Sequence, residues 1–115
     1  DGKTKADGLA VGRPSSFVGR LLFPLVDGIC TVEDAKLLFF LRGLWQSQGI
    51  FVEPSAAAAF QGPVALFTAK GSLLREKLAL PWQNATHIAW ATGGSLVPPA
   101  VAAAYRQAAG CEEGL

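Results

Sequence analysis

The sequence predicts an α/β fold in which short parallel strands alternate with helices. Two features of the chain point to this fold class. Continuous apolar runs alternate with longer segments in which apolar residues recur at helical spacing. Because the runs are apolar throughout, rather than at every second residue, they are typical of strands covered on both faces of a parallel sheet.

The expected strands are short and mostly follow a turn residue. Gly28 and Gly49 precede the first two, and Gly62 with Pro63 precedes the third. The strands are expected at residues 29–32, 50–52, 64–68 and 88–91.

Capping and breaking residues mark the expected helices. Ser15 or Ser16 can cap the first helix, which Pro24 should weaken near its end. Thr31 can cap the second, and Gly49 should end it after Gln48. The helices are expected at residues 17–26, from Thr31 to residue 48, and at residues 56–60, 72–80 and 98–109.

The composition fits one globular domain or a piece of one. The chain has 115 residues, of which 50% are hydrophobic, a net charge of +1 and a mean hydropathy of +0.32. Such a chain has more apolar surface than its own volume easily hides, so it either packs against something else or belongs to something larger. The absence of a basic stripe argues against a nucleic-acid partner, and no apolar run reaches the length of a membrane span.

The two cysteines do not suggest a disulfide or a metal site. Cys30 and Cys111 do not form a Cys-x-x-Cys pair, and no cluster of His and Cys lies near either. We therefore expect a cytoplasmic chain with free thiols and no metal.

The candidate site centres on the end of the strand at residues 88–91. This strand stops at Thr92, and Gly93 and Gly94 then carry a tight loop before a helix. Ligands of open α/β sheets bind beyond the carboxyl ends of strands, where glycines let the backbone approach closely. Thr92 therefore lies where it could contact a cofactor. The alternative is that the two glycines only turn the chain.

Other polar residues lie at turns or strand ends. Asp7, followed by Gly8, and Glu53 share the placement of Thr92, although Asp7 could cap a turn and Glu53 could be solvated. His87 precedes an apolar strand and is better interpreted as a packing residue than as a ligand. No glycine-rich phosphate-binding motif occurs in the sequence.

Three stretches of the chain, in this order and spacing, carry a family resemblance. They are Ala6-Asp7-Gly8-Leu9-Ala10-Val11-Gly12-Arg13-Pro14-Ser15 with Phe17-Val18-Gly19-Arg20, Gly49-Ile50 with Glu53-Pro54-Ser55-Ala56, and Ala85-Thr86-His87 with Trp90-Ala91-Thr92-Gly93-Gly94 and Val97-Pro98. In these stretches the chain resembles the bacterial D-serine dehydratases (D-serine ammonia-lyases), and more broadly the serine and threonine dehydratases.

The resemblance implies a pyridoxal-phosphate enzyme of the tryptophan-synthase-β-like fold (fold type II), which converts D-serine to pyruvate and ammonia. It also implies that residues 1–115 are a C-terminal fragment of the catalytic domain. The family's Schiff-base lysine and phosphate loop lie upstream, and neither motif occurs here. The fragment is therefore expected to need the N-terminal part of the same enzyme and to be inactive alone.

The resemblance also implies roles for individual residues. Thr92 matches the residue whose hydroxyl faces the pyridine nitrogen, and Gly93, Gly94 and Gly8 match backbone near the cofactor. Asp7 and Glu53 match positions near the substrate and cofactor. Two alternatives remain at this stage: a fragment of an L-threonine or L-serine dehydratase, and a remnant without catalysis.

Overall fold

The computed structural model describes residues 3–107, and every regular element within that range is helical. The α-helices are α1 (Ser16–Leu22), α2 (Asp34–Gln48), α3 (Pro54–Ala57), α4 (Gln61–Leu66), α5 (Ser72–Leu78) and α6 (Pro99–Gln107). Short 3-10 turns lie between them: η1 (Asp7–Leu9), η2 (Phe23–Leu25), η3 (Ala58–Phe60), η4 (Ala69–Gly71) and η5 (Trp82–Asn84).

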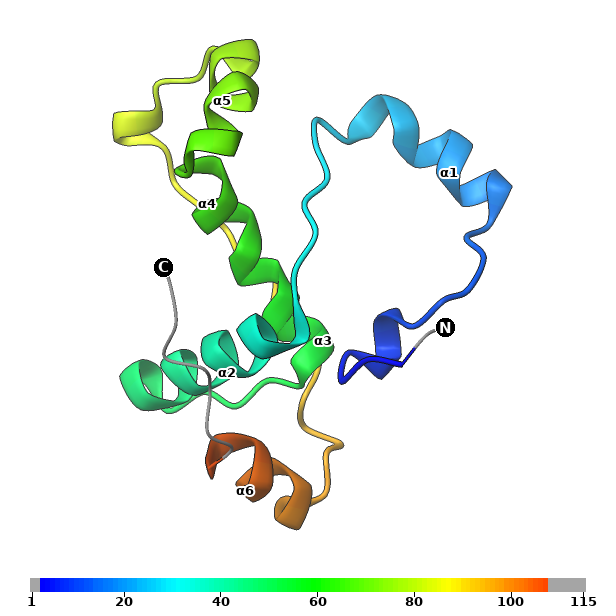
Figure 1. Cartoon of the computed structure of the whole chain (residues 1–115), viewed down its shortest axis with the longest axis vertical. Helices are drawn as coiled ribbons and strands as arrows, with labels where there is room; N and C mark the ends of the chain where they lie inside the picture. Colours follow the sequence, from blue (N-terminus) through cyan, green and yellow to red (C-terminus); the bar gives the residue numbers. More distant parts are fainter. Residues whose placement is uncertain (1–2, 108–115) are drawn as a thin grey trace.

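The core lies where α2 meets α3, and α6 also packs against α2 (Figure 1). Leu41 of α2 is fully buried against Val52, Ala56 and Ala57. Tyr105 of α6 packs on the edge of this cluster. The small side chains of α3 let the two helices approach closely, so the core is compact but contains few large residues.

The predicted α/β fold class is wrong for the described residues, since residues 3–107 contain no strand. Residues 29–32, 50–52 and 88–91 do lack helical structure. A strand, however, needs a neighbour for its backbone hydrogen bonds, and these segments do not form ladders with one another. A single bond joins two of the extended regions: the Glu53 N–H donates to the Gly93 carbonyl at 3.1 Å.

The strand expected at residues 64–68 is wrong for a different reason. Residues 64–66 belong to α4, which follows α3 and η3 in an almost continuous helical run. Pro63 does not break this run because it is the third residue of α4, and the first N–H groups of a helix have no intrahelical acceptor.

Several predicted helix boundaries are confirmed. Ser15 caps α1, and its Oγ accepts a hydrogen bond from the Val18 N–H at 3.4 Å. Gly49 ends α2 in the left-handed conformation, with φ of 68°. The second helix starts later than expected, because Glu33 rather than Thr31 is its N-cap residue. Residues 108–109 of the last expected helix, and Cys111, lie outside the described residues.

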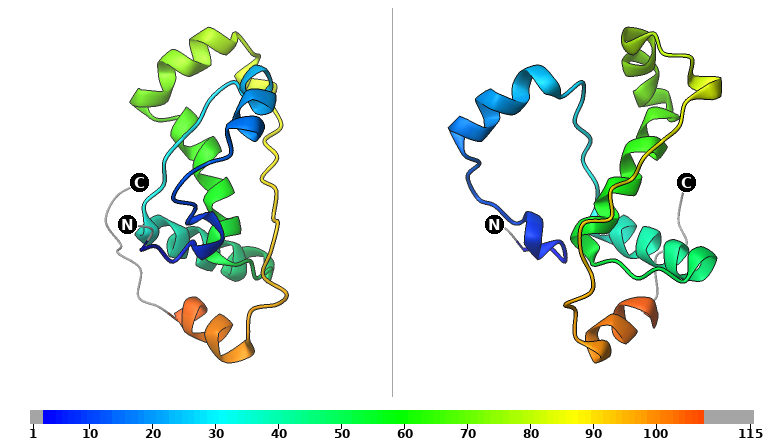
Figure 2. Two further views of the ribbon diagram at one scale, coloured as in Figure 1. Left: turned by 90° about the vertical axis from the view of Figure 1, so that its right-hand side faces the viewer. Right: turned by 180° about the vertical axis from the view of Figure 1, so that it is seen from behind.

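Two parts of the chain project from this centre. The segment with α1 and η2 forms a separate arm, and α4 with α5 forms another (Figure 1). From η5, the chain returns along α4 toward α6 (Figure 2). None of the helices described between residues 3 and 107 is long and apolar enough to cross a membrane.

Candidate functional site

The candidate site is built around the start of α3. Glu53 is the N-cap residue of α3 in an extended conformation, and Pro54 occupies the first turn. The Glu53 carbonyl accepts the Ala57 N–H at 3.1 Å, while its N–H donates to Gly93. This pair of bonds ties the loop after residue 91 to the helix that packs on α2.

The Glu53 carboxylate lies directly against Gly93. A Cβ atom built at Gly93 would lie 2.7 Å from Glu53 Oε1, 2.8 Å from its Cδ and 3.0 Å from its Oε2. No side chain larger than hydrogen fits there unless the carboxylate moves. Gly93 therefore allows a close approach of the backbone to Glu53, and its predicted approach to a cofactor stays a prediction.

Both the backbone conformation at position 94 and the lack of room for a side chain require glycine there. Its φ of 141° is one that other residues rarely adopt. A Cβ there would lie 2.9 Å from the Val52 Cα and 3.0 Å from the Glu53 N. The loop thus lies flat on the segment that leads into α3.

Gly8 reaches the same place from the other end of the chain. It lies in η1, and a Cβ at this position would meet Ser55 Oγ at 3.1 Å and Glu53 Oε1 at 3.9 Å. Segments around residues 8, 53 and 93, which are far apart in sequence, therefore converge on one carboxylate. The sequence alone selected all three segments but could not show that they meet.

Asp7 is oriented within its own turn. It is exposed, and its Oδ1 accepts the Gly8 N–H at 2.8 Å. This contact corresponds to the turn-capping alternative for Asp7. Its predicted position near substrate stays a prediction.

Asp34 holds η1 in position. It accepts hydrogen bonds from the Thr4 Oγ1 and, at 2.7 Å, from the Lys5 N–H. These bonds, led by the one from Thr4, lower the pKa of Asp34 below its ordinary value. Because Asp34 is the first residue of α2, the bonds fix the segment that carries Gly8 to the start of the core helix.

Thr92 precedes the two glycines and its side chain is exposed. It therefore points neither into the core nor into the contact between Gly93 and Glu53. Its hydroxyl is available for a group approaching the loop from outside, and its role toward the pyridine nitrogen stays a prediction.

Ser55 was not selected from the sequence as a site residue. Its Oγ is buried beside Gly8 and has no hydrogen-bond partner among the described residues. Buried hydroxyls normally have partners, so this oxygen marks a polar position that a neighbouring group could complete. The sequence did contain a signal for this residue, because Ser55 directly follows the Glu53-Pro54 pair, which is typical of a helix start.

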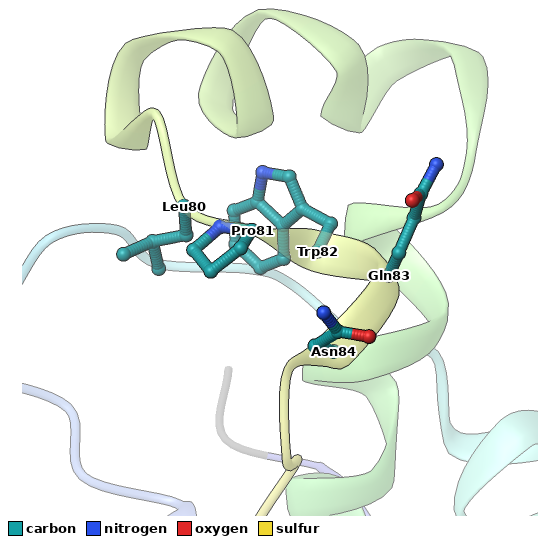
Figure 3. Close-up of a pocket in the computed structure, with 5 residues that line it drawn as sticks. All are labelled: Leu80, Pro81, Trp82, Gln83 and Asn84. Carbon is teal, nitrogen blue, oxygen red and sulfur yellow. The ribbon is translucent and has the colours of Figure 1, made fainter.

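His87 is exposed and belongs to a different cluster, where it contacts two aromatic rings. Its ring is parallel to that of Trp82, with centroids 6.4 Å apart, and lies edge-to-face with the Phe67 ring, with centroids 5.5 Å apart. The nearby hollow is lined by five consecutive residues, Leu80, Pro81, Trp82, Gln83 and Asn84 (Figure 3). Because all five come from one short segment, the hollow lacks the convergent polar groups typical of a ligand site.

A metal site is not visible in residues 3–107: no three side chains of His, Cys, Asp or Glu gather there to hold an ion. The convergence of Gly8, Glu53 and Gly93 is thus the arrangement that best unites the residues selected from the sequence.

The chain is similar to known proteins over a range that includes the segments of Gly8, Glu53 and Gly93. No protein-family model matches the chain. A probable D-serine dehydratase of Halalkalibacterium halodurans is 47% identical over 111 residues, which is 96% of this chain and 25% of that protein. The chain is homologous to a segment of the D-serine dehydratases.

Two further D-serine dehydratases show the same relation. The probable enzymes of Bacillus subtilis and Pseudomonas paraeruginosa are 48% and 50% identical over 108 residues, covering 93% and 91% of this chain. The chain spans about a quarter of the length of these relatives (24–25%). Because the first alignment covers 96% of the chain, it includes the segments of Gly8, Glu53 and Gly93.

Proposed function

We propose that this chain is the C-terminal part of a cytoplasmic D-serine ammonia-lyase, which converts D-serine to pyruvate and ammonia with pyridoxal 5'-phosphate. The observation that carries the proposal is the convergence of Gly8, Glu53 and Gly93, each from one of the stretches that resemble the family. Homology to the D-serine dehydratases over almost the whole chain supports it.

The residues at the convergence fit the ring end of the cofactor better than its phosphate end. Gly8 and Gly93 pack against Ser55 and Glu53, and Gly94 packs against the backbone of residues 52–53, so a flat ring would meet the outer side of this loop, where Thr92 is exposed. The Glu53 carboxylate would repel a phosphate group. The phosphate would accordingly be held by another part of the enzyme.

Thr92 would donate its hydroxyl hydrogen to the pyridine nitrogen. A hydroxyl bonds the neutral nitrogen, whereas a carboxylate in its place would keep that nitrogen protonated. When bound, the cofactor withdraws electrons from the substrate Cα; a neutral ring does so less strongly, which favours prompt loss of the β-hydroxyl group over transamination.

Glu53 would keep the loop that carries Thr92 in position. Its backbone N–H holds the Gly93 carbonyl, and its carboxylate packs on the Gly93 Cα. With Thr92 adjacent to Gly93, a shift of this contact moves the hydroxyl as well. Positioning errors of about 1 Å are large enough to cost ~100-fold in rate.

The remainder of the enzyme would supply the lysine that attaches the cofactor and the phosphate-binding loop. Neither motif occurs in this sequence. We therefore expect residues 1–115 alone to release no pyruvate from D-serine. The partner in this proposal is the N-terminal part of a D-serine dehydratase chain.

A chimeric enzyme tests the function. This chain replaces the homologous 108 residues of the Bacillus subtilis relative, and the product is assayed with D-serine, L-serine and L-threonine. We expect pyruvate from D-serine in preference to both L-amino acids. A folded chimera that binds the cofactor but prefers L-threonine or L-serine would contradict the substrate assignment, and one that acts on none of them would contradict the function.

Thr92→Val tests the assigned role in the same chimera. The substitution keeps the shape and removes the hydroxyl, so kcat/KM should fall about 10-fold to 100-fold, equivalent to one hydrogen bond of about 1.5–3 kcal/mol. Thr86→Val is the matched control, since Thr86 is also exposed and precedes the same segment. Equal activity of the two variants would refute the role of Thr92.

A further inference from the structure

The arm formed by residues 16–32 is the most apolar exposed part of the described chain. It consists of α1, η2 and the extended segment up to Val32. Its large exposed apolar residues are Phe17, Val18, Leu21, Leu22, Phe23, Leu25, Val26 and Ile29. Only Arg20 and Asp27 are charged within it. Depletion of charge with exposed aliphatic and aromatic residues is the composition of an interface core rather than of a free surface.

The size of the molecule supports the same conclusion. The chain exposes 8920 Å², whereas a compact protein of 12.0 kDa exposes about 6,000 Å² by the scaling of monomeric proteins. Its radius of gyration is 15.5 Å, against about 13 Å for a compact domain of this length. The excess on this chain alone, on the order of 3,000 Å², is larger than the roughly 800 Å² that one partner contributes to a standard interface.

The arm has few internal contacts to keep it in place. None of its residues is buried, and its α-helix has only seven residues, a length that is marginal in water without packing. A Cβ at Gly28 would lie 2.9 Å from Leu74 Cδ2, so α5 touches the arm at this glycine. Most of its apolar surface therefore needs a covering that residues 3–107 do not supply.

We propose that the arm is the docking surface for the part of a D-serine dehydratase that this sequence lacks, an inference that rests on the proposed function. The relatives are about four times longer than their match, since the chain covers 25% of the first, and the matched region includes the arm. The arm thus exists in proteins that carry the remaining three quarters. That remainder is large enough to bury an excess of this size.

The extended end of the arm suggests how docking would occur. Residues 29–32 are apolar and lack strand partners in the described chain, and Ile29 is 92% exposed. Packing of this segment against the remainder of the enzyme would cover its side chains and give its backbone groups partners.

Cys30 provides a reporter within this segment, because its thiol is free and exposed. In a Cys111→Ser background, the rate of Cys30 alkylation is measured by mass spectrometry for the isolated chain and for the chimera with the Bacillus subtilis relative. We expect at least a 100-fold slower reaction in the chimera. If Cys30 is alkylated at the same rate in the isolated chain and in a chimera that melts cooperatively, the proposal is overturned. Slow alkylation of Cys30 in the isolated chain would also overturn it, because it would indicate that a second copy of the chain covers the arm.

A matched pair of substitutions tests the location of the surface. Leu25 in η2 is 76% exposed and Leu73 in α5 is 75% exposed. Because both are equally exposed in the chain, Lys at either position should have a similar small effect on the isolated chain. In the chimera, Leu25→Lys should lower the melting temperature by at least 5 °C more than Leu73→Lys. Equal melting temperatures, or a chimera without a cooperative melt, would contradict docking through the arm.

These outcomes separate docking from function. A chimera with protected Cys30 that does not convert D-serine would contradict the proposed function and leave the docking surface intact. A chimera that converts D-serine while Cys30 reacts as fast as in the isolated chain would contradict the docking surface and support the proposed function.

Discussion

Helices α1 and α2 have the same kind of sequence but opposite surroundings. Both carry apolar residues at helical spacing, with a polar residue at the start. In α2, Leu37, Leu38 and Leu41 are buried because α3 and α6 cover them. In α1 no residue is buried. The apolar face of a helix can therefore be recognised from spacing, whereas the element that covers the face cannot.

This difference separates the described chain into a packed centre and an exposed arm. The centre includes the candidate site, since Glu53 caps the helix that packs on α2. Most hydrophobic stabilisation of the isolated chain should come from this centre, because exposed apolar side chains contribute little until something covers them.

Removing a core side chain should have the largest effect. Leu41→Ala opens a cavity where Leu41 is 0% exposed, and should lower the free energy of unfolding by about 2–5 kcal/mol. Leu21→Ala in the arm, where the side chain is 56% exposed, should change it by less than about 1 kcal/mol. Urea unfolding followed by far-UV circular dichroism measures the free energy of unfolding of both variants. A similar decrease for the two would contradict the distinction between a packed centre and an exposed arm.

A substitution in the site loop should have the next largest effect. Gly94→Ala forces a side chain into a conformation with φ of 141° against the Val52 backbone, and should cost about 1–3 kcal/mol. Gly43→Ala is the control, because a Cβ there meets nothing within 4 Å and Gly43 lies inside α2. That control should stabilise the chain by about 0.5–1 kcal/mol. A Gly94→Ala variant as stable as the parent would show that the loop does not lie on residue 52.

The contact between α6 and α2 should contribute less. The Arg106 guanidinium lies 4.5 Å from the centre of the Trp45 ring, so Arg106→Ala should cost about 0.5–1 kcal/mol. Arg20→Ala in the arm is the matched control, since the Arg20 Nε bonds only within its own helix, to the Ser16 carbonyl. Chemical denaturation with Trp fluorescence compares the two. If Arg20→Ala were the more harmful change, the packing assigned to α6 would be wrong.

The smallest effect should be a local one with a defined pH dependence. The folded-state pKa of Asp34 is lowered by the bonds from Thr4 and Lys5. The stability that these bonds give is therefore present above the ordinary pKa of 3.8 and lost as pH falls through the lower, folded value. Amide exchange at Lys5 should therefore speed up, relative to the intrinsic rate, as pH falls through this lowered pKa.

Asp34→Asn should make that exchange fast at pH 7 and abolish the pH dependence. Asp27→Asn, in the arm, is the control and should change neither. Exchange at Lys5 that stays slow in Asp34→Asn would mean that η1 is held by other contacts.

The sequence selected the segments of Gly8, Glu53 and Gly93, and only the structure shows that they lie together. The sequence predicted Gly8 at a turn, Glu53 and Thr92 at the ends of strands, and Gly93 in the loop that follows. The three segments do converge, yet through a helix start, a 3-10 turn and a loop rather than through a sheet edge. Glycines at positions of close approach could be recognised from the sequence. The burial of the Ser55 Oγ beside Gly8 and the bonds of Asp34 to Thr4 and Lys5 could not, because these partners lie 29 to 47 residues away along the chain.

The sequence by itself determined the local elements of this protein. Ser15 caps α1, Gly49 ends α2, and the apolar face of α2 is the one that spacing indicates, because capping and helical periodicity involve neighbours within a few residues. Only the tertiary structure decided whether apolar extended segments became strands. Residues 29–32 and 88–91 have the composition of strands, but a ladder needs a second chain segment at the right distance, and the described residues do not provide one.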